Sequence, residues 1–355
     1  MAVKKDGAQK LSTVIIGAGG IAQKHAEALA RIDGVRIAAV LDPNEAASSA
    51  LAKKCAGNSA AQCGPRVISR LEEVLDEVQM IHLLSPPSKR LDYVRSAVNA
   101  GKHIFCEKPI AVNLDEAEEM ARIAAERKVL FMTAFNMRFR PGYLRLCGDV
   151  LDGKLGDIVS VWVHRIGPGS GFNAPLGDSW RTDPNLVCGM TIESLSHDID
   201  MIRGFGVEIE NVSAWVKGSR ADLSAFDNHA QVHLGLAGGR SGLINASWAS
   251  HLPMASRGVV GTKGTAAICG DGFFDFMTYR IKTADLPHEE VIRINDPFDS
   301  ESYYTENKHF IECIEKGKQP LVTANNGVMA LRVSHAILES AKKGQTVQVN
   351  RSGLC

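Results

Sequence analysis

The sequence lacks the features that mark secreted, membrane-spanning and nucleic-acid-binding chains. Its 355 residues include 40 basic and 40 acidic side chains, so the formal net charge is zero. Without a basic excess, neither nucleic acid nor an anionic membrane surface is an expected partner. No apolar run is long enough to span a bilayer, and the opening MAVKKDGAQK lacks the apolar segment of a signal peptide.

The cysteine spacings of a disulfide framework or a zinc site are also missing. The eight cysteines are scattered and form no C-x-x-C pair, so we interpret them as reduced thiols of a cytoplasmic protein. No internal repeat, low-complexity tract or linker rich in Pro and Ser interrupts the chain. A chain of 355 residues is longer than one core usually fills, and we therefore expect two domains.

The first 135 residues alternate between short apolar runs and amphipathic segments. The apolar runs lie at 12–19, 35–42, 78–85, 102–107 and 129–135, and the helical patterns lie at 20–32, 44–55, 90–101 and 113–128. Runs that are apolar throughout are typical of parallel strands covered on both faces. The pattern predicts an α/β domain over 1–135 with a doubly wound parallel sheet of the Rossmann type.

The turn after the first predicted strand reads GAGGIA, and it fits the dinucleotide pattern G-x-G-x-x-G/A at Gly17, Gly19 and Ala22. Gly17 permits a tight turn, and Gly19 lets a pyrophosphate approach the backbone. The amino terminus of the next helix, with Gly20 and Ile21, then faces the phosphates. Such a turn between a strand and a helix predicts a dinucleotide site.

Asp42 ends the second predicted strand, 23 positions after Gly19. A carboxylate there can accept hydrogen bonds from the adenosine ribose hydroxyls, and its charge would repel a 2′-phosphate. Residues 43–45 are Pro, Asn and Glu, so no basic side chain follows to hold that phosphate. The cofactor prediction is therefore NAD, which is favoured over NADP. The alternative interpretation makes Asp42 a cap of the following helix.

The second half has a different pattern, with strands that alternate apolar and polar residues and follow one another without helices between them. These runs lie at 158–167, 210–218, 230–236, 241–248, 257–262 and 265–270, and helical patterns lie at 141–153, 307–317 and 326–344. Alternation is typical of an antiparallel sheet with one covered face. We predict an α/β domain over 136–355 with a large, mostly antiparallel open sheet.

Residues 189–200, GMTIESLSHDID, place Glu193, His197 and Asp200 at spacings of four and three. If the stretch is one helix, these side chains share a face and two carboxylates flank an imidazole. Three interpretations are open: a catalytic face, the polar face of an amphipathic helix, or a set of metal ligands. The catalytic interpretation is preferred below, and no metal is predicted.

Several segments resemble the Gfo/Idh/MocA family of glucose–fructose oxidoreductase-like and inositol dehydrogenase-like proteins. In the family's order they are GAGGIAQKH at 17–25, SPP at 85–87, AGKHIFCEKPIA at 100–111, SWR at 179–181, ESLSHDID at 193–200 and the closing stretch 307–349. The resemblance extends from residue 12 to about residue 349. It implies a nicotinamide-dependent enzyme that acts on a carbohydrate or cyclitol and assembles as a homodimer or homotetramer. The second domain would then bind substrate and form the oligomer.

The resemblance also implies roles for single residues. Lys108 matches the family's catalytic lysine, and its bond to Pro109 would be cis. His197 matches the catalytic histidine, and Glu193 could orient its ring, although the family usually has aspartate there. An imidazole suits such proton transfer because its pKa of about 6.5 leaves both protonation states accessible. Asp200 could lie near the substrate or make a structural hydrogen bond.

The remaining assignments concern the cofactor and the substrate. Besides the glycine turn and Asp42, the resemblance assigns the cofactor to Ser85, Pro86, Glu107, Lys108, Trp180 and Arg181. For Trp180 and Arg181, packing plus a surface ion pair is an equal alternative. Substrate contacts are predicted for Lys108, Asn136, His164, Arg165, Asp183, Glu193 and His197. Arg90 receives no role because the family often has histidine there, and Leu195, which replaces a common glycine, could narrow the space beside His197.

The leading hypothesis is an NAD-dependent dehydrogenase, or in reverse a ketoreductase, with Lys108 and His197 handling the proton. An alternative is redox-neutral glycoside cleavage, in which the sugar is oxidised transiently and the glycosidic bond is eliminated. A third is a regulatory protein that binds NAD without turnover. The first accumulates NADH and the second releases an aglycone without net NADH.

Overall fold

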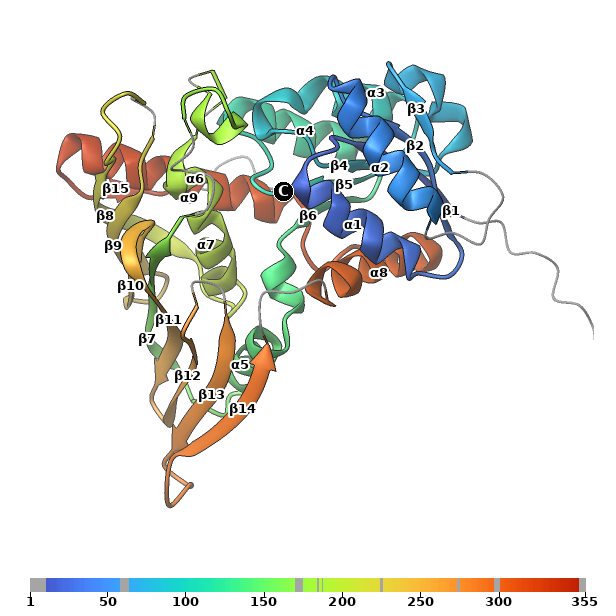
Figure 1. Cartoon of the computed structure of the whole chain (residues 1–355). Helices are drawn as coiled ribbons and strands as arrows, with labels where there is room; N and C mark the ends of the chain where they lie inside the picture. The colour runs from blue at the N-terminus through green and yellow to red at the C-terminus, as the bar shows by residue number, and fades with distance from the viewer. Residues whose placement is uncertain are drawn as a thin grey trace, which may run out of the picture. The chain divides into compact units, whose positions relative to one another are not determined.

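The computed structural model describes residues 11–57, 64–169, 175–183, 185–186, 188–223, 226–272, 275–296 and 301–350. The chain divides into two compact units, which are described separately. Unit 1 comprises Met1–Ala134 and Ser300–Asn326, and unit 2 comprises Phe135–Asp299 and Gly327–Cys355. Each unit is an α/β structure built on one sheet (Figure 1).

Unit 1 contains a six-stranded parallel sheet in the order β3-β2-β1-β4-β5-β6. Its strands are β1 (Leu11–Ile16), β2 (Val35–Leu41), β3 (Arg66–Ile68), β4 (Met80–Leu83), β5 (His103–Glu107) and β6 (Phe131–Ala134). The strand order reverses between β1 and β4, and ligands of such sheets bind at the carboxyl ends beside that point. The predicted doubly wound sheet is confirmed; β3 was not predicted.

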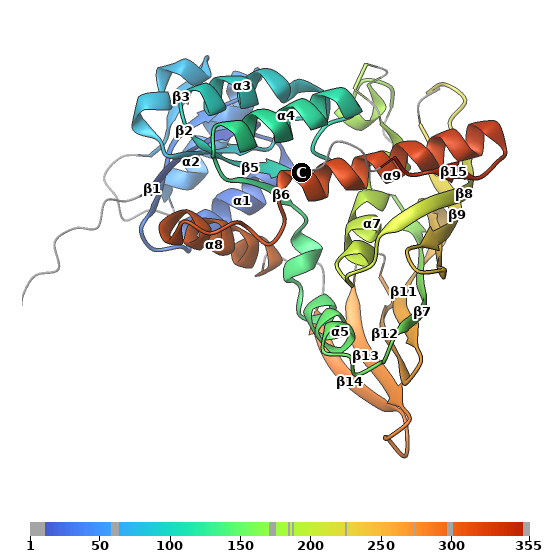
Figure 2. The same ribbon diagram turned by 180° about the vertical axis from the view of Figure 1, so that it is seen from behind.

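Helices cover both faces of this sheet, which is why its strands are apolar throughout. They are α1 (Gly20–Ala30), α2 (Glu45–Gly57), α3 (Leu91–Asn99), α4 (Leu114–Glu126) and α8 (Glu301–Lys316). Helix α1 packs against α2 and α8, whereas α3 packs against α4 on the other face (Figures 1 and 2). At the sheet centre, Val14, Ile15 and Ile16 are at most 1% exposed.

Helix α8 joins unit 1 although nearly 170 residues of unit 2 precede it in the chain. The sequence pattern predicts a helix at 307–317, and the structure extends it to Glu301–Lys316. Nothing in that pattern indicates which sheet the helix covers. Its placement matters below because two of its side chains, Glu306 and Asn307, are fully buried in unit 1.

Unit 2 contains a nine-stranded sheet in the order β14-β13-β12-β11-β7-β10-β9-β8-β15. Its strands are β7 (Ile158–Pro168), β8 (Ile209–Lys217), β9 (His229–Leu236), β10 (Arg240–Ser247), β11 (Ala249–Gly261), β12 (Gly264–Gly270), β13 (Phe276–Thr283), β14 (Glu290–Asp296) and β15 (Val347–Gln348). Only β7 and β10 pair in parallel among the described ladders. The predicted, mostly antiparallel sheet is confirmed, although β13, β14 and β15 were not predicted.

One face of this sheet is covered by helices and the other is open. The helices of unit 2 are α5 (Pro141–Leu151), α6 (Gly189–Glu193), α7 (Leu195–Arg203) and most of α9 (Ala324–Lys343). Along β7, Val161, Val163 and Arg165 are buried, whereas Trp162 and His164 alternate with them and are partly exposed. This alternation is the period-two pattern that the sequence shows at 158–167.

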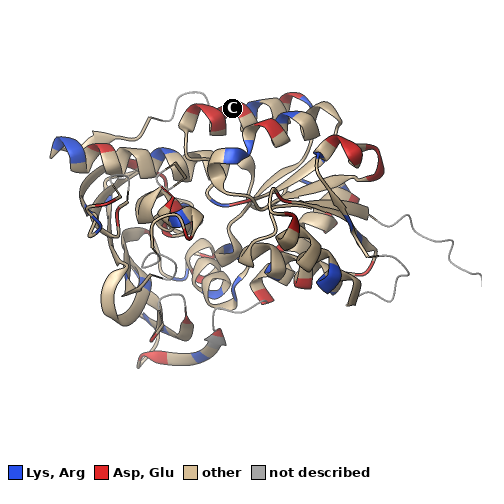
Figure 3. Cartoon of the chain, turned by 45° about the horizontal axis from the view of Figure 1, so that its top comes forward, with Lys and Arg blue, Asp and Glu red and all other residues tan. Residues whose placement is uncertain are grey.

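Short single turns complete the described elements: η1 (Leu71–Glu73), η2 (Leu75–Glu77), η3 (Pro87–Lys89), η4 (Asn136–Phe139) and η5 (Trp180–Thr182). Within the described ranges, no helix combines the length and the apolar character that crossing a membrane requires. Acidic and basic side chains both occur along the helices of the chain (Figure 3), and some pair one turn apart, as Arg122 does with Glu126.

Candidate functional site

The glycine turn between β1 and α1 leaves its backbone uncovered where a phosphate would approach. Gly17 has a φ of +100°, and an added Cβ would lie 2.7 Å from the backbone nitrogen of Ser85. At Gly19 and Gly20, an added Cβ would meet nothing within 4 Å. No side chain caps the amino terminus of α1, and its first turn holds no acidic residue. These features fit an anion held by backbone N–H groups.

Asp42 lies at the end of β2, as predicted, and its carboxylate braces the glycine turn. Its Oδ2 accepts from the Ala18 N–H at 2.7 Å, and its Oδ1 accepts from the Asn44 N–H at 2.8 Å. The cap of α2 comes instead from Asn44, whose Oδ1 accepts from the Ala47 N–H at 3.1 Å. Each carboxylate oxygen has a second lone pair, so Asp42 keeps the capacity to accept from ribose hydroxyls.

Ser85 and Pro86 follow β4, next to the point where the strand order reverses. The Oγ of Ser85 is buried and has no hydrogen-bond partner among the described residues. Since buried hydroxyls are rarely left unsatisfied, this one fits a ligand group that the chain itself does not supply. The uncovered glycines, Asp42 and the Ser85 hydroxyl together fit a dinucleotide laid across the carboxyl ends of β1, β2 and β4.

Arg90, to which the sequence analysis assigned no role, ties the ends of β4 and β5 together. It is 3% exposed, and its Nε donates to the Ser85 carbonyl at 3.0 Å. Its Nη1 donates to the carbonyls of Glu107 and Pro109. Family resemblance could not reveal this clamp, because it depends on a side chain that the family often lacks. The signal available was an arginine directly before a helix.

Lys108 directly follows β5 and is half-buried. Its backbone N–H donates to Oε2 of Glu107 at 2.9 Å, and its bond to Pro109 is cis, as the resemblance implies. The structure therefore brings Ser85, Glu107 and Lys108 to one edge of the unit 1 sheet, with Arg90 holding their backbone. This edge is where doubly wound sheets bind their ligands.

The carboxylate of Glu107 points into the core of unit 1, toward α1 and α8. Its Oε1 lies 3.1 Å from Nε2 of His25, and both residues are buried. Burial alone would raise the pKa of Glu107, but the hydrogen bond with His25 and the nearby positive charges of Lys108 and Arg90 lower it below its ordinary value. The carboxylate is therefore ionised at neutral pH.

Asn307 of α8 connects His25 with a second buried histidine, His82 of β4. Its Nδ2 lies 2.9 Å from Nδ1 of His25, and its Oδ1 lies 2.8 Å from Nε2 of His82. His82 is completed by Thr13, whose hydroxyl lies 2.8 Å from Nδ1. Burial lowers the pKa of His82 to about 3, so its ring is neutral.

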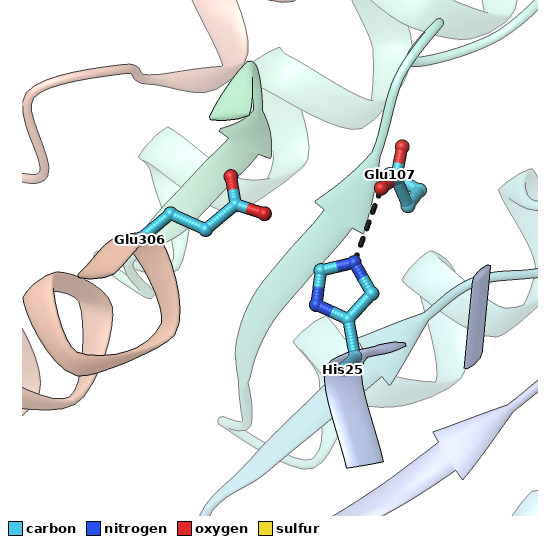
Figure 4. Close-up of side chains that lie close together, drawn as sticks. All are labelled: His25, Glu107 and Glu306. Carbon is cyan, nitrogen blue, oxygen red and sulfur yellow. Dashed lines mark hydrogen bonds and ion pairs between the residues drawn. The ribbon is translucent and has the colours of Figure 1, made fainter. Parts of the chain in front are cut away.

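Glu306, one residue before Asn307, points its carboxyl group toward the His25–Glu107 pair (Figure 4). Oxygen and nitrogen atoms of the three side chains lie within 4.8 Å of one another. Sequence analysis missed this cluster entirely, because its three members come from α1, β5 and α8. A carboxylate inside a helix of ordinary amphipathic pattern carries no signal of its own.

In unit 2 the stretch 189–200 is not one continuous helix, contrary to expectation. Helix α6 ends at Glu193 and α7 begins at Leu195, with Ser194 at φ −108° and ψ −39° between them. Ser194 is held from outside, because its Oγ accepts from Arg165 at 2.9 Å. The stretch is therefore helical on both sides of Ser194, with a one-residue break between α6 and α7.

Each carboxylate of this stretch pairs with an arginine. Glu193 accepts from the Nη2 of Arg181 at 2.6 Å, and Asp200 accepts from the Nε of Arg138 at 2.6 Å. Arg181 also lies over the Trp180 ring, 4.5 Å from its centre. These are the contacts that the packing interpretation of Trp180 and Arg181 expects, and Asp200 makes the structural contact that was its alternative. The cofactor roles of Trp180 and Arg181, and the orienting role of Glu193, stay predictions.

His197 lies in α7 and is 6% exposed, with its ring edge-on to Phe135 at 5.8 Å between ring centres. Its helix is anchored by Asp198, which accepts from Arg165 at 2.6 Å and from Arg257 at 3.0 Å. All three anchoring side chains are fully buried. The anchor fixes the helix that carries His197, although the sequence offered no sign of it.

Two of the four other predicted substrate contacts, His164 and Arg165, lie on opposite faces of the unit 2 sheet. Arg165 and His164 are neighbours on β7, so their side chains point to opposite faces of the sheet. Arg165 faces α7, and His164 lies on the other face, 3.1 Å from Asn245. Asp183 follows η5 and accepts from the Asn185 N–H at 2.8 Å, and Asn136 is buried in η4. Arg165 therefore holds α7, and the substrate contacts of His164, Asn136 and Asp183 stay predictions.

Comparison with known proteins adds a second line of observation. A family model described as "Oxidoreductase family, NAD-binding Rossmann fold" matches residues 11–135, and one described as "Oxidoreductase family, C-terminal alpha/beta domain" matches residues 149–349. The inositol 2-dehydrogenase of Rhizobium meliloti (strain 1021) is 27% identical over 357 residues, which cover 94% of this chain and 98% of that protein. The scyllo-inositol 2-dehydrogenase (NAD(+)) of Bacillus subtilis (strain 168) is 25% identical over 346 residues, 95% of each chain.

Among solved structures, a levoglucosan dehydrogenase in complex with NADH and levoglucosan superposes with a TM-score of 0.84. It is 20% identical and covers 97% of this chain and 100% of its own. At that identity the likeness shows the fold alone.

Proposed function

Because the chain belongs to the Gfo/Idh/MocA family of NAD-binding oxidoreductases, we propose that it is a dehydrogenase, or in reverse a ketoreductase, of a sugar, cyclitol or related polyol. The reaction joins a secondary alcohol to its ketone. Two relatives that match nearly the whole chain are named inositol dehydrogenases, which supports this substrate class. NAD is the cofactor, and the absence of a basic side chain at 43–45 disfavours NADP.

The observation that carries the proposal is the position of Lys108. It stands at the carboxyl end of β5, in the unit whose glycine turn, Asp42 and Ser85 hydroxyl fit a dinucleotide. Its backbone is held on one side by Glu107, and the carbonyls beside it are held by Arg90. Because this backbone is fixed, the ammonium group of Lys108 can be positioned consistently relative to a bound substrate.

Bound NAD accepts the hydride from the alcohol carbon, or returns it in the reverse direction. The chain itself must handle the hydroxyl proton. We assign this task to Lys108 and His197: an ammonium group donates a hydrogen bond to the substrate oxygen, and an imidazole takes up or releases the proton. Lys108 directly follows β5 and His197 lies within α7, so the backbone of each is held by a regular element.

Glu193 is proposed as the group that orients His197. Its carboxylate is already held by Arg181, so it has a fixed direction. Among the other predicted substrate contacts, Asn136 and Asp183 remain candidates, while Arg165 is committed to Ser194 and Asp198. The substrate contact of His164 also stays a prediction.

An absorbance assay for NADH tests the proposal with purified protein, NAD and a panel of sugars, cyclitols and simple glycosides. NADH should accumulate with at least one polyol, and Lys108→Ala should lower the rate by about 100-fold or more. Lys102, which lies before β5 and is partly exposed, supplies the control variant Lys102→Ala. Release of an aglycone without net NADH would replace the proposal by redox-neutral cleavage, and nucleotide binding without any turnover would leave a regulator.

We also propose that the chain forms a homodimer or homotetramer through the open face of the unit 2 sheet. Trp215, Leu243 and Met254 are 69%, 42% and 45% exposed, and the strand register places them on the face away from α7. Exposed apolar side chains gathered on one face are typical of an interface. Analytical ultracentrifugation should find an oligomer that Leu243→Glu dissociates, and a monomeric wild type would refute the proposal.

A further inference from the structure

Glu306 is the least satisfied side chain in the described part of unit 1. It is 0% exposed, and neither carboxyl oxygen has a hydrogen-bond partner among the described residues. The titratable groups next to it are Glu107 from β5 and His25 from α1, and the His25 ring in turn contacts His82 from β4 and Tyr303 from α8. Since a buried unpaired charge is very costly, the state of this group needs an explanation.

The hydrogen-bond partners of His25, which lies beside Glu306, determine which of its ring nitrogens carries a proton. Asn307 Nδ2 donates to the Tyr303 carbonyl at 2.7 Å, which fixes the amide orientation. The same NH₂ group then faces Nδ1 of His25, so Nδ1 accepts and the proton sits on Nε2. Nε2 donates that proton to Glu107. His25 therefore satisfies one carboxylate and adds no positive charge for a second.

A metal ion could also balance two carboxylates, and the three side chains are close enough to hold one. The hydrogen bonds argue against it. A metal at Nε2 of His25 would move the proton to Nδ1, where it would face the NH₂ group of Asn307. Turning the Asn307 amide would then set its oxygen against the Tyr303 carbonyl. Metal-bound histidines instead direct their second N–H at an acceptor.

A proton on Glu306 resolves the charge without these conflicts. We propose that Glu306 is a buried carboxylic acid that keeps its proton at neutral pH and acts as a positioning residue for Lys108 through the carboxylate of Glu107. Burial, and then the charge of Glu107, raise the pKa of Glu306 well above its ordinary value, in agreement with this assignment. The neutral acid lets Glu107 stay ionised and accept the Lys108 N–H.

Ionisation of Glu306 would put two like charges in one buried cluster. The carboxylate of Glu107 would then be pushed away from His25 and from the Lys108 backbone, so the catalytic lysine would lose its support at alkaline pH. This part of the inference rests on the proposed function. Whether Glu306 is protonated does not depend on the proposed function, and it can be tested separately.

The proton is tested by infrared spectroscopy and by unfolding experiments on the whole protein. At pH 8 the wild type should show the C=O stretch of a protonated carboxyl group, and Glu306→Gln should lose it. Glu315→Gln, an exposed change on the same helix, should keep it. Because unfolding releases this proton above pH 4.5, Glu306→Gln should gain about tenfold in its folding constant over the wild type for each pH unit between 4.5 and the pKa in the folded state.

Absence of the protonated-carboxyl band in the wild type would overturn the proposal, even if Glu306→Gln failed to fold. A difference in unfolding free energy between the wild type and Glu306→Gln that did not change with pH would also overturn the proposal. Stabilisation of the wild type by Zn²⁺ or Mn²⁺, lost in Glu306→Gln, would replace the proton by a metal site.

The positioning role is tested by the pH profile of the Lys108-dependent reaction. The wild-type kcat/KM should fall at alkaline pH as Glu306 ionises, and in Glu306→Gln this fall should move to higher pH, while Glu315→Gln keeps the wild-type profile. An unmoved profile, with the proton demonstrated, would overturn the positioning role alone. If the wild type has no turnover, the proposed function fails, and the spectroscopic result still decides the proton.

Discussion

The two units bury their acidic side chains in different ways. In unit 2, Asp198, Asp200 and Asp296 each contact a guanidinium group, from Arg165 and Arg257, from Arg138 and from Arg140 respectively. In unit 1, Glu107 is held by an imidazole and a backbone N–H, and Glu306 has no partner among the described residues. The guanidinium of Arg90 in unit 1 binds carbonyl oxygens instead of a carboxylate.

The difference distinguishes buried charges that hold elements in place from buried groups that can gain or lose a proton. Burial lowers the pKa of Arg165 to about 10, which still leaves this partner of Asp198 charged at neutral pH. Such pairs hold elements in place and do not titrate in the working range. Imidazoles and unpaired carboxyls do titrate. Asp227 is the exception in unit 2: it caps α6 through Thr191, and burial raises its pKa to about 6.

The largest expected effect comes from breaking the charge pairs of unit 2. Asp198→Asn removes the carboxylate that faces Arg165 and Arg257, and all three side chains are fully buried. Two guanidinium groups would then lie in the core without their counter-charge. We expect the free energy of unfolding to fall by about 3–5 kcal/mol, measured by urea denaturation. A loss below about 1 kcal/mol would show that water reaches this cluster.

Arg90 tests this comparison, because it is a buried arginine in unit 1 that holds backbone carbonyls in position and does not pair with a carboxylate. Arg90→Met leaves the carbonyls of Ser85, Glu107 and Pro109 without their donor. We expect a loss of about 2–3 kcal/mol in unfolding free energy. The dissociation constant for NADH, measured by fluorescence, should rise as well, since the two strand ends separate.

Lys89→Met is the matched control, because it removes the same charge one residue earlier from an exposed side chain. It should leave both measurements near the wild-type values. Unchanged NADH affinity in a folded Arg90→Met protein would mean that the clamp serves stability only.

The free energy of unfolding at acidic pH provides a further test of the buried groups in unit 1. Burial lowers the pKa of His82 from 6.5 to about 3. Above pH 6.5 both states are neutral, and the stability contribution is complete; below it the unfolded chain binds a proton that the folded chain refuses. Relative to His82→Gln, the wild type should therefore lose about 1.4 kcal/mol per pH unit between pH 6.5 and 3. A difference independent of pH would show a protonated His82 in the fold.

The smallest effect belongs to the exposed pairs. Arg122 and Glu126 are 60% and 58% exposed, so water and salt screen their attraction. Glu126→Gln should leave the unfolding midpoint in urea unchanged. A measurable loss that disappears at high salt would mean that surface pairs contribute more to this protein than exposed pairs usually do.

The parts of the fold and site that the sequence predicts are those with local signals. The run at 12–16 followed by GAGGIA specifies strand, turn and helix within a dozen residues, and the structure has them as β1, the glycine turn and α1. Asp42 is found at the end of β2 because apolar runs end where strands end. Lys108 after β5 follows by the same argument.

The remainder depends on contacts between distant segments. Glu306 and Asn307 meet His25 only because α8 returns to unit 1, about 280 residues along the chain from α1. The Asp198 pairs need two strands and a helix at once. In the stretch 189–200, the one-residue break at Ser194 and the hydrogen bond that Ser194 accepts from Arg165 of β7 were also not predicted. No periodicity in one segment records such a contact.

His82 and Glu306, both buried in unit 1, change protonation in opposite directions when the chain folds. Between pH 4.5 and 6.5 the unfolded chain carries its proton on His82, and the folded chain carries it on Glu306. Folding then exchanges no net proton with solvent through this pair. The proton that His82 gives up on folding is matched by the proton that Glu306 keeps. Acidification within this window therefore leaves the summed contribution of these two groups to the free energy of unfolding unchanged. Replacing His82 or Glu306 alone would make the free energy of unfolding depend on pH through the group that remains.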